Sequence, residues 1–256
     1  MFYRYTKANC RIPVDFEGAF SGSCFLAGGA PSLSKEKNLQ QLIQPGISLM
    51  AMNNTAALFS SGVDFWVGGD KPLCYSNRIL MDPSITKFGS ISRRDWQVGD
   101  QKWRECPNTY FFGTTTDFTL KTFLKPHRDF VWWKNTFYIA IQILYRLGFR
   151  KVYLIGCGFK LKEKEEHYSY GKQLTLDEVK WNQGTYNTVV ERMKYMKEYF
   201  DSLGFSIISC TPDSALNDTY PVMSLDKALD ASLRDFPEDY EIEKCVHSSF
   251  FKKEKR

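Results

Sequence analysis

A short apolar run that ends in a glycine-rich turn is the feature that most constrains the fold of this chain. Residues Ser23–Ala27 read SCFLA and lead directly into GGAPS, and helix-like sequence then continues until Pro45-Gly46. A second apolar run, Ile47–Met52, follows and ends in a pair of asparagines. Short apolar runs bounded by turn residues are typical of strands that are buried on both faces. Strand, helix and strand in this order, with short connections, predict βαβ units and a parallel sheet.

The same alternation continues along the chain. Phe65–Val67 is a third apolar run, which ends in a Gly-Gly-Asp turn. We expect Lys151–Ile155 (KVYLI) and Phe205–Cys210 to be further strands, because both are short and apolar. Phe137–Leu147 is apolar on nearly every face and Tyr186–Leu203 is amphipathic, so both are predicted to be helices. The chain is therefore expected to have an α/β, Rossmann-like fold, in which helices cover both faces of a mostly parallel sheet.

Residues 71–134 interrupt this regularity. Aromatic residues, proline and arginine mix there without a clear period. We expect this stretch to be an insertion or lid that shapes an acceptor site, within one nucleotide-binding domain that spans residues 1–256. Tryptophans among basic residues suit the stacking of sugars or bases next to a polyanion, and the segment contains Trp96, Trp103, Trp132 and Trp133. The charged segment 245–256 is expected to be a tail.

The composition is that of an ordinary globular protein. Hydrophobic residues make up 43% of the 256 residues, charged residues 25%, and the net charge is +5. No apolar run reaches the roughly 18 residues of a membrane span, and the first residues lack the apolar core of a signal peptide. The seven cysteines include no CxxC pair, which argues against a zinc site or a redox motif. Cys24, Cys157 and Cys210 lie in apolar runs and are expected to be small buried hydrophobes in a reducing compartment. We therefore expect a cytoplasmic protein without a membrane span.

The glycine-rich turn is the first candidate for chemistry. Glycines let the backbone approach a ligand closely, and free N–H groups at the start of a helix attract phosphate. The turn is neither a Walker loop nor a GxGxxG fingerprint, and a simple tight turn would have a similar sequence. A Cβ atom at Gly28 or Gly29 is expected to occupy the volume of the ligand. The residues expected to bind a nucleotide are Gly28, Gly29, Ala30, Pro31, Ser32, Asn53, Asn54, Asp70 and Gly156.

Polar residues that follow or flank the next two strands form a second candidate group. Ligands of open α/β sheets bind outside the carboxyl ends of the strands, so Asn53, Asn54, Asp64 and Asp70 are expected to face the same crevice as the glycine turn. Capping of turns by the asparagines and ordinary turn chemistry at Asp70 are the alternatives. Asp64 and Asp70 could also hold a Mg²⁺ ion bound to phosphates.

His167 is a candidate general base. It is one of three histidines and lies shortly after the strand Lys151–Ile155, in the segment EEHYSYG. Histidine is the natural base near neutral pH because its ordinary pKa lies there. A lone histidine in a loop is, however, more often simply exposed to solvent.

Four segments together resemble a known family. CFLAGGAPSL, LMAMNN, VDFWVGGDKP and FYIAIQILYRLGFRKVYLIGCGF are similar, in this order, to the archaeal 6-hydroxymethylpterin diphosphokinase-like proteins and to the bacterial sialyltransferases that use cytidine-monophosphate sialic acid. Bacterial and bacteriophage members are common in this broad group. The resemblance covers roughly residues 23–70 and 135–215, and it implies a Rossmann-like fold with the nucleotide over the glycine turn and Asn53.

The resemblance also implies catalytic residues. In the sialyltransferases, a histidine followed by tyrosine beyond the last central strand serves as the general base, and His167-Tyr168 matches that position. One position departs from the family pattern, which usually reads Gly-x-Asp-Phe after this strand. Here the segment is Gly156-Cys157-Gly158-Phe159, so a role that needs a carboxylate at residue 158 is in doubt.

Three functions remain open from the sequence. The first is a glycosyltransferase that holds a nucleotide-sugar on the glycine turn and uses His167 to deprotonate a hydroxyl of a glycan or of a hydroxylated DNA base, as in DNA modification. The clusters of basic residues slightly favour DNA as the acceptor. The second is a diphosphokinase, which needs Mg²⁺ and carboxylates and is weakened by the missing acid at residue 158. The third is a non-catalytic nucleotide-binding module. No tightly bound cofactor is expected, apart from the possible Mg²⁺.

Overall fold

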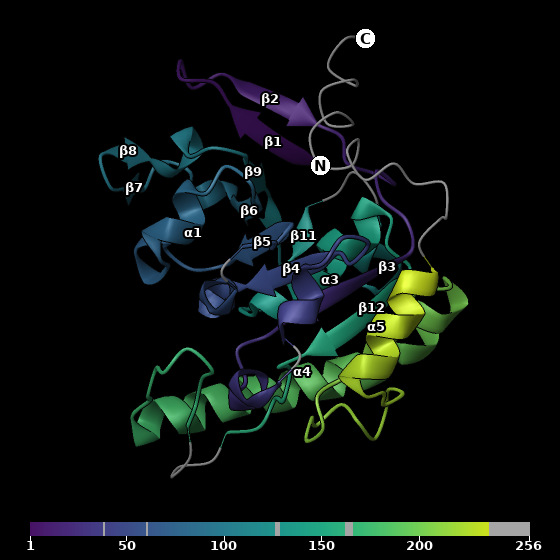
Figure 1. Cartoon of the computed structure of the whole chain (residues 1–256). Helices are drawn as coiled ribbons and strands as arrows, with labels where there is room; N and C mark the ends of the chain where they lie inside the picture. Colours follow the sequence, from purple (N-terminus) through teal and green to yellow (C-terminus); the bar gives the residue numbers. More distant parts are fainter. Residues whose placement is uncertain (38, 60, 126–128, 162–165, 236–256) are drawn as a thin grey trace.

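A nine-stranded sheet forms the centre of the molecule in this computed structural model, which describes residues 1–37, 39–59, 61–125, 129–161 and 166–235 (Figure 1). Its strand order is β13-β12-β3-β4-β5-β6-β9-β1-β2. Neighbouring strands from β13 to β9 are parallel, whereas β1 is antiparallel to both β9 and β2. The strands are β1 (Phe2–Tyr5), β2 (Arg11–Val14), β3 (Ser23–Ala27), β4 (Leu49–Met52), β5 (Phe65–Gly68), β6 (Thr86–Ser90), β9 (Thr109–Phe112), β12 (Lys151–Ile155) and β13 (Ser206–Ser209).

Helical elements cover both faces of this sheet. Side chains alternate between the faces along each strand, so Cys24 and Leu26 of β3 belong to one hydrophobic core while Phe25 and Ala27 belong to the other. The first core is covered by α3 (Thr136–Leu147) and α4 (Leu176–Ser202). The second is covered by η1 (Pro31–Lys35), η2 (Leu39–Ile43), η3 (Asn53–Leu58), α1 (Asn77–Met81) and α5 (Leu225–Arg234). The predicted α/β, Rossmann-like architecture is confirmed.

The strand order reverses between β3 and β12. From β3 the chain moves outward in one direction through β4, β5, β6 and β9, and α3 then carries it back so that β12 pairs with the other side of β3. Loops that leave two such neighbouring strands diverge to opposite faces and open a crevice at the carboxyl edge of the sheet. The turns after β3 and β12, at Gly28 and Gly156, therefore lie where a ligand is expected.

Residues 71–134 belong to the body of the fold, so the expectation of an insertion or lid is wrong for most of this segment. It supplies β6 and β9, which are interior strands of the central sheet. Trp103 is fully buried against Gly89, where any side chain would collide with its indole ring. The aromatic residues obscure the strand pattern because they fill the core beneath these strands. The segment also contains η4 (Pro72–Cys74), η5 (Ile91–Arg93), β7 (Gln97–Val98), β8 (Gln101–Lys102), η6 (Trp103–Glu105), β10 (Thr114–Thr115) and α2 (Leu120–Phe123), and β11 (Phe130–Val131) pairs with β10.

Two helices differ from the sequence-based expectation. The element after the glycine turn is only the 3-10 turn η1, whose N-cap is Ala30. The long helix α4 begins at Leu176, well before the expected start at Tyr186, because Thr175 and Glu178 form a capping box there. No helix within the described part of the chain has both the length and the apolar character needed to cross a membrane. The charged segment 245–256 lies outside the described residues.

Candidate functional site

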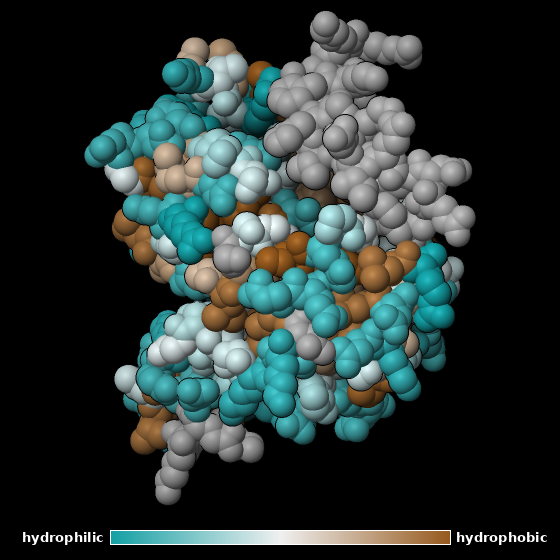
Figure 2. Space-filling view, viewed as in Figure 1, coloured by the Kyte–Doolittle hydropathy of each residue, from teal (hydrophilic) through white to brown (hydrophobic). Residues whose placement is uncertain are grey.

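A cavity of about 400 Å³ opens at the carboxyl edge of the sheet, over the reversal point between β3 and β12. Figure 2 shows it as a notch at the left edge of the molecule, between the segments after β4 and β5 and the first turns of α4. Its lining includes the glycine turn, the start of η3, the start of α3, the segment after β12 and one face of α4. A cavity of this size fits a ligand of the size of a nucleotide. Most of the residues that the sequence predicts to bind a nucleotide therefore line one hollow of the folded chain.

The two glycine turns pack against each other at the floor of the cavity. A Cβ atom on Gly28 would lie 2.5 Å from the carbonyl oxygen of Gly156 and 2.8 Å from Sγ of Cys157. The backbone N–H of Ala30 also donates to the Gly156 oxygen, over 2.8 Å. Glycine is therefore required at residue 28 by the neighbouring turn itself, whether or not a ligand approaches. Gly28, Ala30, Pro31 and Gly156 all line the cavity as predicted.

Two stacked tyrosines form one wall beside Gly29. The rings of Tyr168 and Tyr170 lie 5.1 Å apart with an angle of 16° between their planes. The backbone N–H of Ser169 donates to the carbonyl oxygen of Gly29 over 2.9 Å, which holds this wall against the glycine turn. A Cβ atom on Gly29 would lie 3.1 Å from the Tyr170 ring and 3.2 Å from the Tyr168 ring. At Gly29 the space for a side chain is thus taken by the tyrosine wall.

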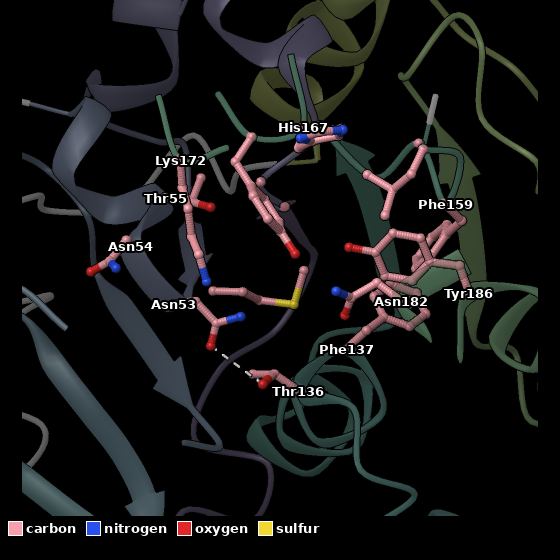
Figure 3. Close-up of a pocket in the computed structure, with 18 of the residues that line it drawn as sticks. Asn53, Asn54, Thr55, Thr136, Phe137, Phe159, His167, Lys172, Asn182 and Tyr186 are labelled. Carbon is pink, nitrogen blue, oxygen red and sulfur yellow. Dashed lines mark hydrogen bonds between the residues drawn. The ribbon is translucent and has the colours of Figure 1, made fainter. Parts of the chain in front are cut away.

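Thr55 brings an unsatisfied hydroxyl to the same corner. Its side chain is buried, and Oγ1 has no hydrogen-bond partner among the described residues. Figure 3 shows this oxygen directed into the cavity. Buried hydroxyls nearly always have a partner, from protein, water or a bound molecule. A hydroxyl or phosphate oxygen of a ligand next to Gly29 would supply that partner, so the residues present fit the predicted nucleotide.

Asn53 has a left-handed backbone conformation and aims its amide at the cavity. Its φ angle is 52°, in the left-handed region that few residues other than glycine adopt. Trp66 Nε1 donates to its backbone oxygen over 2.6 Å, and Thr136 Oγ1 donates to its side-chain Oδ1 over 3.3 Å. Figure 3 shows the remaining amide nitrogen facing the hollow. Asn53 therefore presents a preorganised donor, as a nucleotide-binding residue would.

Of the other predicted binding residues, Asn54 has a structural role and Ser32 lies outside the cavity lining. Asn54 points away from the centre of the cavity (Figure 3), and its amide is used on both sides: Nδ2 donates to the Cys74 oxygen over 2.8 Å, and Oδ1 accepts from Ser76 N–H over 3.1 Å. It therefore caps a turn, which was the alternative reading of this residue. Ser32 lies within η1 and is not among the residues that line the cavity.

The prediction that Asp64 and Asp70 face one crevice is wrong. Asp64 precedes β5 and lies at the amino edge of the sheet, whereas Asp70 follows β5 and lines the cavity at the carboxyl edge. Asp64 is partly buried there, and its Oδ2 accepts the N–H of Leu49 over 2.8 Å. Burial raises the pKa of Asp64 to about 6, although this hydrogen bond acts in the opposite direction. The length of β5 separates the two carboxylates, so they cannot bind one Mg²⁺ ion together.

His167 lies in the cavity wall rather than in an exposed loop. Only 4% of its surface is exposed, and Nδ1 accepts the backbone N–H of Leu174 over 3.0 Å. A neutral imidazole that accepts at Nδ1 carries its proton on Nε2, so Nε2 is a donor in this arrangement. A general base at Nε2 would require the opposite tautomer. The hydrogen bond at Nδ1 holds the segment that carries Tyr168 and Tyr170, and the role of His167 as a general base stays a prediction.

Positive groups gather around the opening. Lys134, Lys160 and Lys172 all line the cavity and are exposed. The first residues of α3 also line it, so the positive end of the dipole of this 12-residue helix faces the hollow. Glu178 brings a negative charge to the same lining, but its carboxylate accepts hydrogen bonds from Thr175 in the capping box. These charges favour an anionic ligand such as a phosphate.

One whole face of α4 was missed by the sequence analysis. Residues at helical spacing along its first three turns line the cavity, namely Glu178, Trp181, Asn182, Thr185 and Tyr186. The Thr-x-x-Glu pattern at Thr175 was the signal that could have placed the helix start here. Because α4 starts early, these turns extend the helix to the carboxyl edge of the sheet and close the cavity on that side.

The segment after β12 contains a phenylalanine with a left-handed backbone and a glycine with room for a side chain. Phe159 has a φ angle of 53°, yet its ring is buried 5.0 Å from the ring of Phe137. At Gly158 a Cβ atom would meet only Cβ of Ala30, at 3.4 Å, so a side chain would fit. The glycine at 158, where the resembled family has aspartate, is thus not imposed by steric crowding.

No group of three or more histidine, cysteine or acidic side chains among the described residues is arranged to hold a metal ion. No protein-family model matches the chain, and no curated protein matches it either. Among solved structures the chain is similar to the MAf glycosyltransferase from Magnetospirillum magneticum AMB-1, with a TM-score of 0.46 and 10% sequence identity. The similarity covers 84% of this chain and 36% of that one, so the chain spans about a third of the length of that protein.

Proposed function

We propose that this protein is a glycosyltransferase that uses a nucleotide-sugar donor. The observation that carries the proposal is the cavity over the strand-order reversal, whose wall combines lysines, tyrosine hydroxyls and the positive end of α3. Such a set is suited to a ligand that is part base, part sugar and part phosphate, because each part meets groups of matching chemistry. The resemblance of the flanking segments to nucleotide-sugar enzymes agrees with this assignment.

In the proposed complex the nucleotide lies over the glycine turn. The amide nitrogen of Asn53 and the hydroxyl of Thr55 bind its ribose or phosphate oxygens. Lys172 and the N-terminal N–H groups of α3 stabilise the charge on the phosphate that leaves. Tyr170 remains neutral and can donate, since burial, with the nearby Tyr168 and Asp70, raises the pKa of its hydroxyl above the ordinary value.

The proposed reaction is displacement at the anomeric carbon of the donor sugar. An acceptor hydroxyl oxygen forms the new bond to this carbon, the bond from the carbon to the phosphate oxygen breaks, and the nucleotide leaves with that electron pair. The hydroxyl proton goes to a base. We assign this role to Asp70, because it lines the cavity and is exposed, while the Glu178 carboxylate is bound in the helix cap.

The decisive experiment is calorimetric titration with cytidine monophosphate and with uridine, guanosine and adenosine diphosphates, each with and without Mg²⁺. We expect one of them to bind without Mg²⁺, and the matching nucleotide-sugar to release free nucleotide only when an acceptor is present. Lys172→Ala is expected to weaken this binding about tenfold, in a salt-dependent way, because it removes one charge near the phosphate.

Lys194→Ala is the matched control, since Lys194 is an exposed lysine of α4 that does not line the cavity. It should leave the affinity unchanged. Absence of binding by all four nucleotides would overturn the proposal. Binding of adenosine nucleotides that strictly requires Mg²⁺ would replace it with the diphosphokinase function.

A further inference from the structure

The six tryptophans divide into five that are engaged in packing and one that is not. Trp66 hydrogen-bonds to Asn53, Trp103 is buried, and Trp132 covers Gly69, where a Cβ atom would collide with its ring. Trp96 and Trp133 lie under the cationic groups of Lys71 and Arg192, at 4.9 Å and 4.0 Å from the ring centres. The four tryptophans of the segment 71–134 therefore already pack against other groups of the protein, and little aromatic surface remains there for an acceptor.

Trp181 is the exception. It is 75% exposed on the first turns of α4, and it lines the mouth of the cavity. No ring stacking or cation contact involves it among the described residues. An exposed indole costs free energy through its hydration, and large exposed apolar groups next to a pocket are typical of binding surfaces. Its backbone is rigid because it lies within a 27-residue helix.

Two polar side chains of α4 lie near this indole in the cavity wall. Asn182 follows Trp181 directly, and Thr185 lies four residues further along; both line the cavity. Figure 3 shows the amide of Asn182 facing the hollow. Nδ2 of Asn182 donates to the Glu178 oxygen over 2.7 Å, and Oγ1 of Thr185 donates to the Trp181 oxygen over 3.3 Å, so the amide oxygen and the hydroxyl oxygen can still accept from a sugar. An aromatic ring for the apolar C–H face of a sugar, beside acceptors for its hydroxyls, is a combination that binds carbohydrates.

The charges around Trp181 argue for a neutral ligand. Asp177 and Glu178 lie on the turn before it, and Lys172 and Lys180 offset them, so these four charges next to Trp181 sum to zero. Elsewhere, Arg94 and Arg104 are paired with Asp95 at 3.3 Å and 3.4 Å. Binding of a DNA backbone requires a cluster of cations that neutralises several phosphates. This surface therefore fits a neutral carbohydrate better than a nucleic acid.

We propose that the Trp181 face of α4 is an acceptor subsite that stacks a pyranose ring of a neutral glycan at the mouth of the cavity. This inference rests on the proposed function, in which the donor occupies the floor of the same cavity. It assigns the acceptor to a carbohydrate and moves the acceptor site from the segment 71–134 to α4.

Nuclear magnetic resonance of the indole N–H groups tests this subsite without any need for the donor. The full-length protein is titrated with methyl glucoside, methyl galactoside, methyl N-acetylglucosaminide and lactose, and separately with a ten-nucleotide oligothymidylate. We expect at least one saccharide to shift the Trp181 signal, which Trp181→Phe identifies by its disappearance. Trp181→Ala should weaken saccharide binding about tenfold, the typical effect of losing one stacked ring.

The control is Tyr195→Ala, which removes another exposed aromatic side chain of α4 about 21 Å further along the helix axis. It should not change saccharide binding. The subsite is rejected if none of the four saccharides shifts the Trp181 signal, or if the oligothymidylate shifts it instead. A parallel titration with the four nucleotides separates the two proposals: nucleotide binding without saccharide binding removes only the subsite.

Discussion

The two edges of the central sheet carry similar residue types and have opposite physical characters. At the amino edge, Lys87 is buried, Asp64 is partly buried, and both are bound by backbone groups. Leu49 N–H donates to Asp64, and Lys87 donates to the carbonyl oxygens of Asp82 and Ile85. At the carboxyl edge, Asp70 and Lys172 are exposed and line an open cavity. Charged residues at the first edge contribute to folding, and those at the second are available to a ligand. Substitutions at the two edges should therefore change different measurements.

The largest expected effect is on activity at the carboxyl edge. Asp70→Asn is expected to lower the rate of the proposed glycosyl transfer about 10²–10⁴-fold, as loss of the proposed general base would. Its free energy of unfolding should stay within about 0.5 kcal/mol of the wild type, because the side chain is exposed. Single-turnover rates and urea unfolding measure the two quantities. Asp64→Asn is the matched control and should keep full activity; if both variants lose activity equally, the contrast between the edges fails.

The second effect is on stability at the amino edge. Burial raises the pKa of Asp64 from 3.8 to about 6, so the folded protein holds this proton more tightly than the unfolded chain. The resulting stabilisation is fully present below about pH 4 and is lost as the pH rises through 6, which amounts to about 3 kcal/mol. Asp64→Asn keeps an acceptor for Leu49 and carries no charge, so it should be more stable than the wild type at pH 8.

Urea unfolding at pH 4.5, 6 and 8 measures this difference. The gap between Asp64→Asn and the wild type should widen from the lowest pH to the highest. A difference in unfolding free energy that stays constant with pH would mean that the Asp64 carboxylate is solvated in the folded protein, and that the amino edge is open to water.

A third, smaller effect separates positioning from catalysis at His167. His167→Ala removes the acceptor for Leu174 N–H, so the tyrosine wall should loosen and nucleotide affinity should fall about tenfold. His167→Asn places an amide oxygen near the position of Nδ1 and should restore most of that affinity and of the activity. If the asparagine variant is as inactive as the alanine variant while nucleotide binding is normal in both, His167 is the general base predicted from the sequence.

The smallest effect concerns the missing carboxylate. Gly158→Asp should fold normally, because a Cβ atom there contacts only Ala30. The added negative charge on the cavity wall should weaken binding of an anionic nucleotide by a few-fold, since it opposes the surrounding lysines. Gly158→Ser has a similar size and no charge, and its affinity should match the wild type. Tighter nucleotide binding by the aspartate variant would instead show that the carboxylate contacts a donor group of the ligand.

The sequence predicts correctly which polar residues lie at the carboxyl edge when they follow a strand, and wrongly when they precede one. Residues that follow an apolar run, such as Asn53 and Asp70, were placed correctly at the carboxyl edge, because chain direction decides which edge a strand end meets. Asp64 was misplaced because it precedes its strand, which puts it at the other edge. The aromatic segment 71–134 was misread since buried tryptophans and exposed ones have the same sequence signature.

The sequence by itself determined five of the parallel strands, β3, β4, β5, β12 and β13, and the position of the glycine turn, because these follow from local apolar patterns and from turn residues. Only the tertiary structure decided which polar groups meet. It buried His167 with Nδ1 bound to a backbone N–H, separated Asp64 from Asp70 by the length of β5, and left Trp181 as the exposed tryptophan of the cavity wall. These outcomes depend on contacts between residues far apart in the chain, and such contacts leave no local pattern in the sequence.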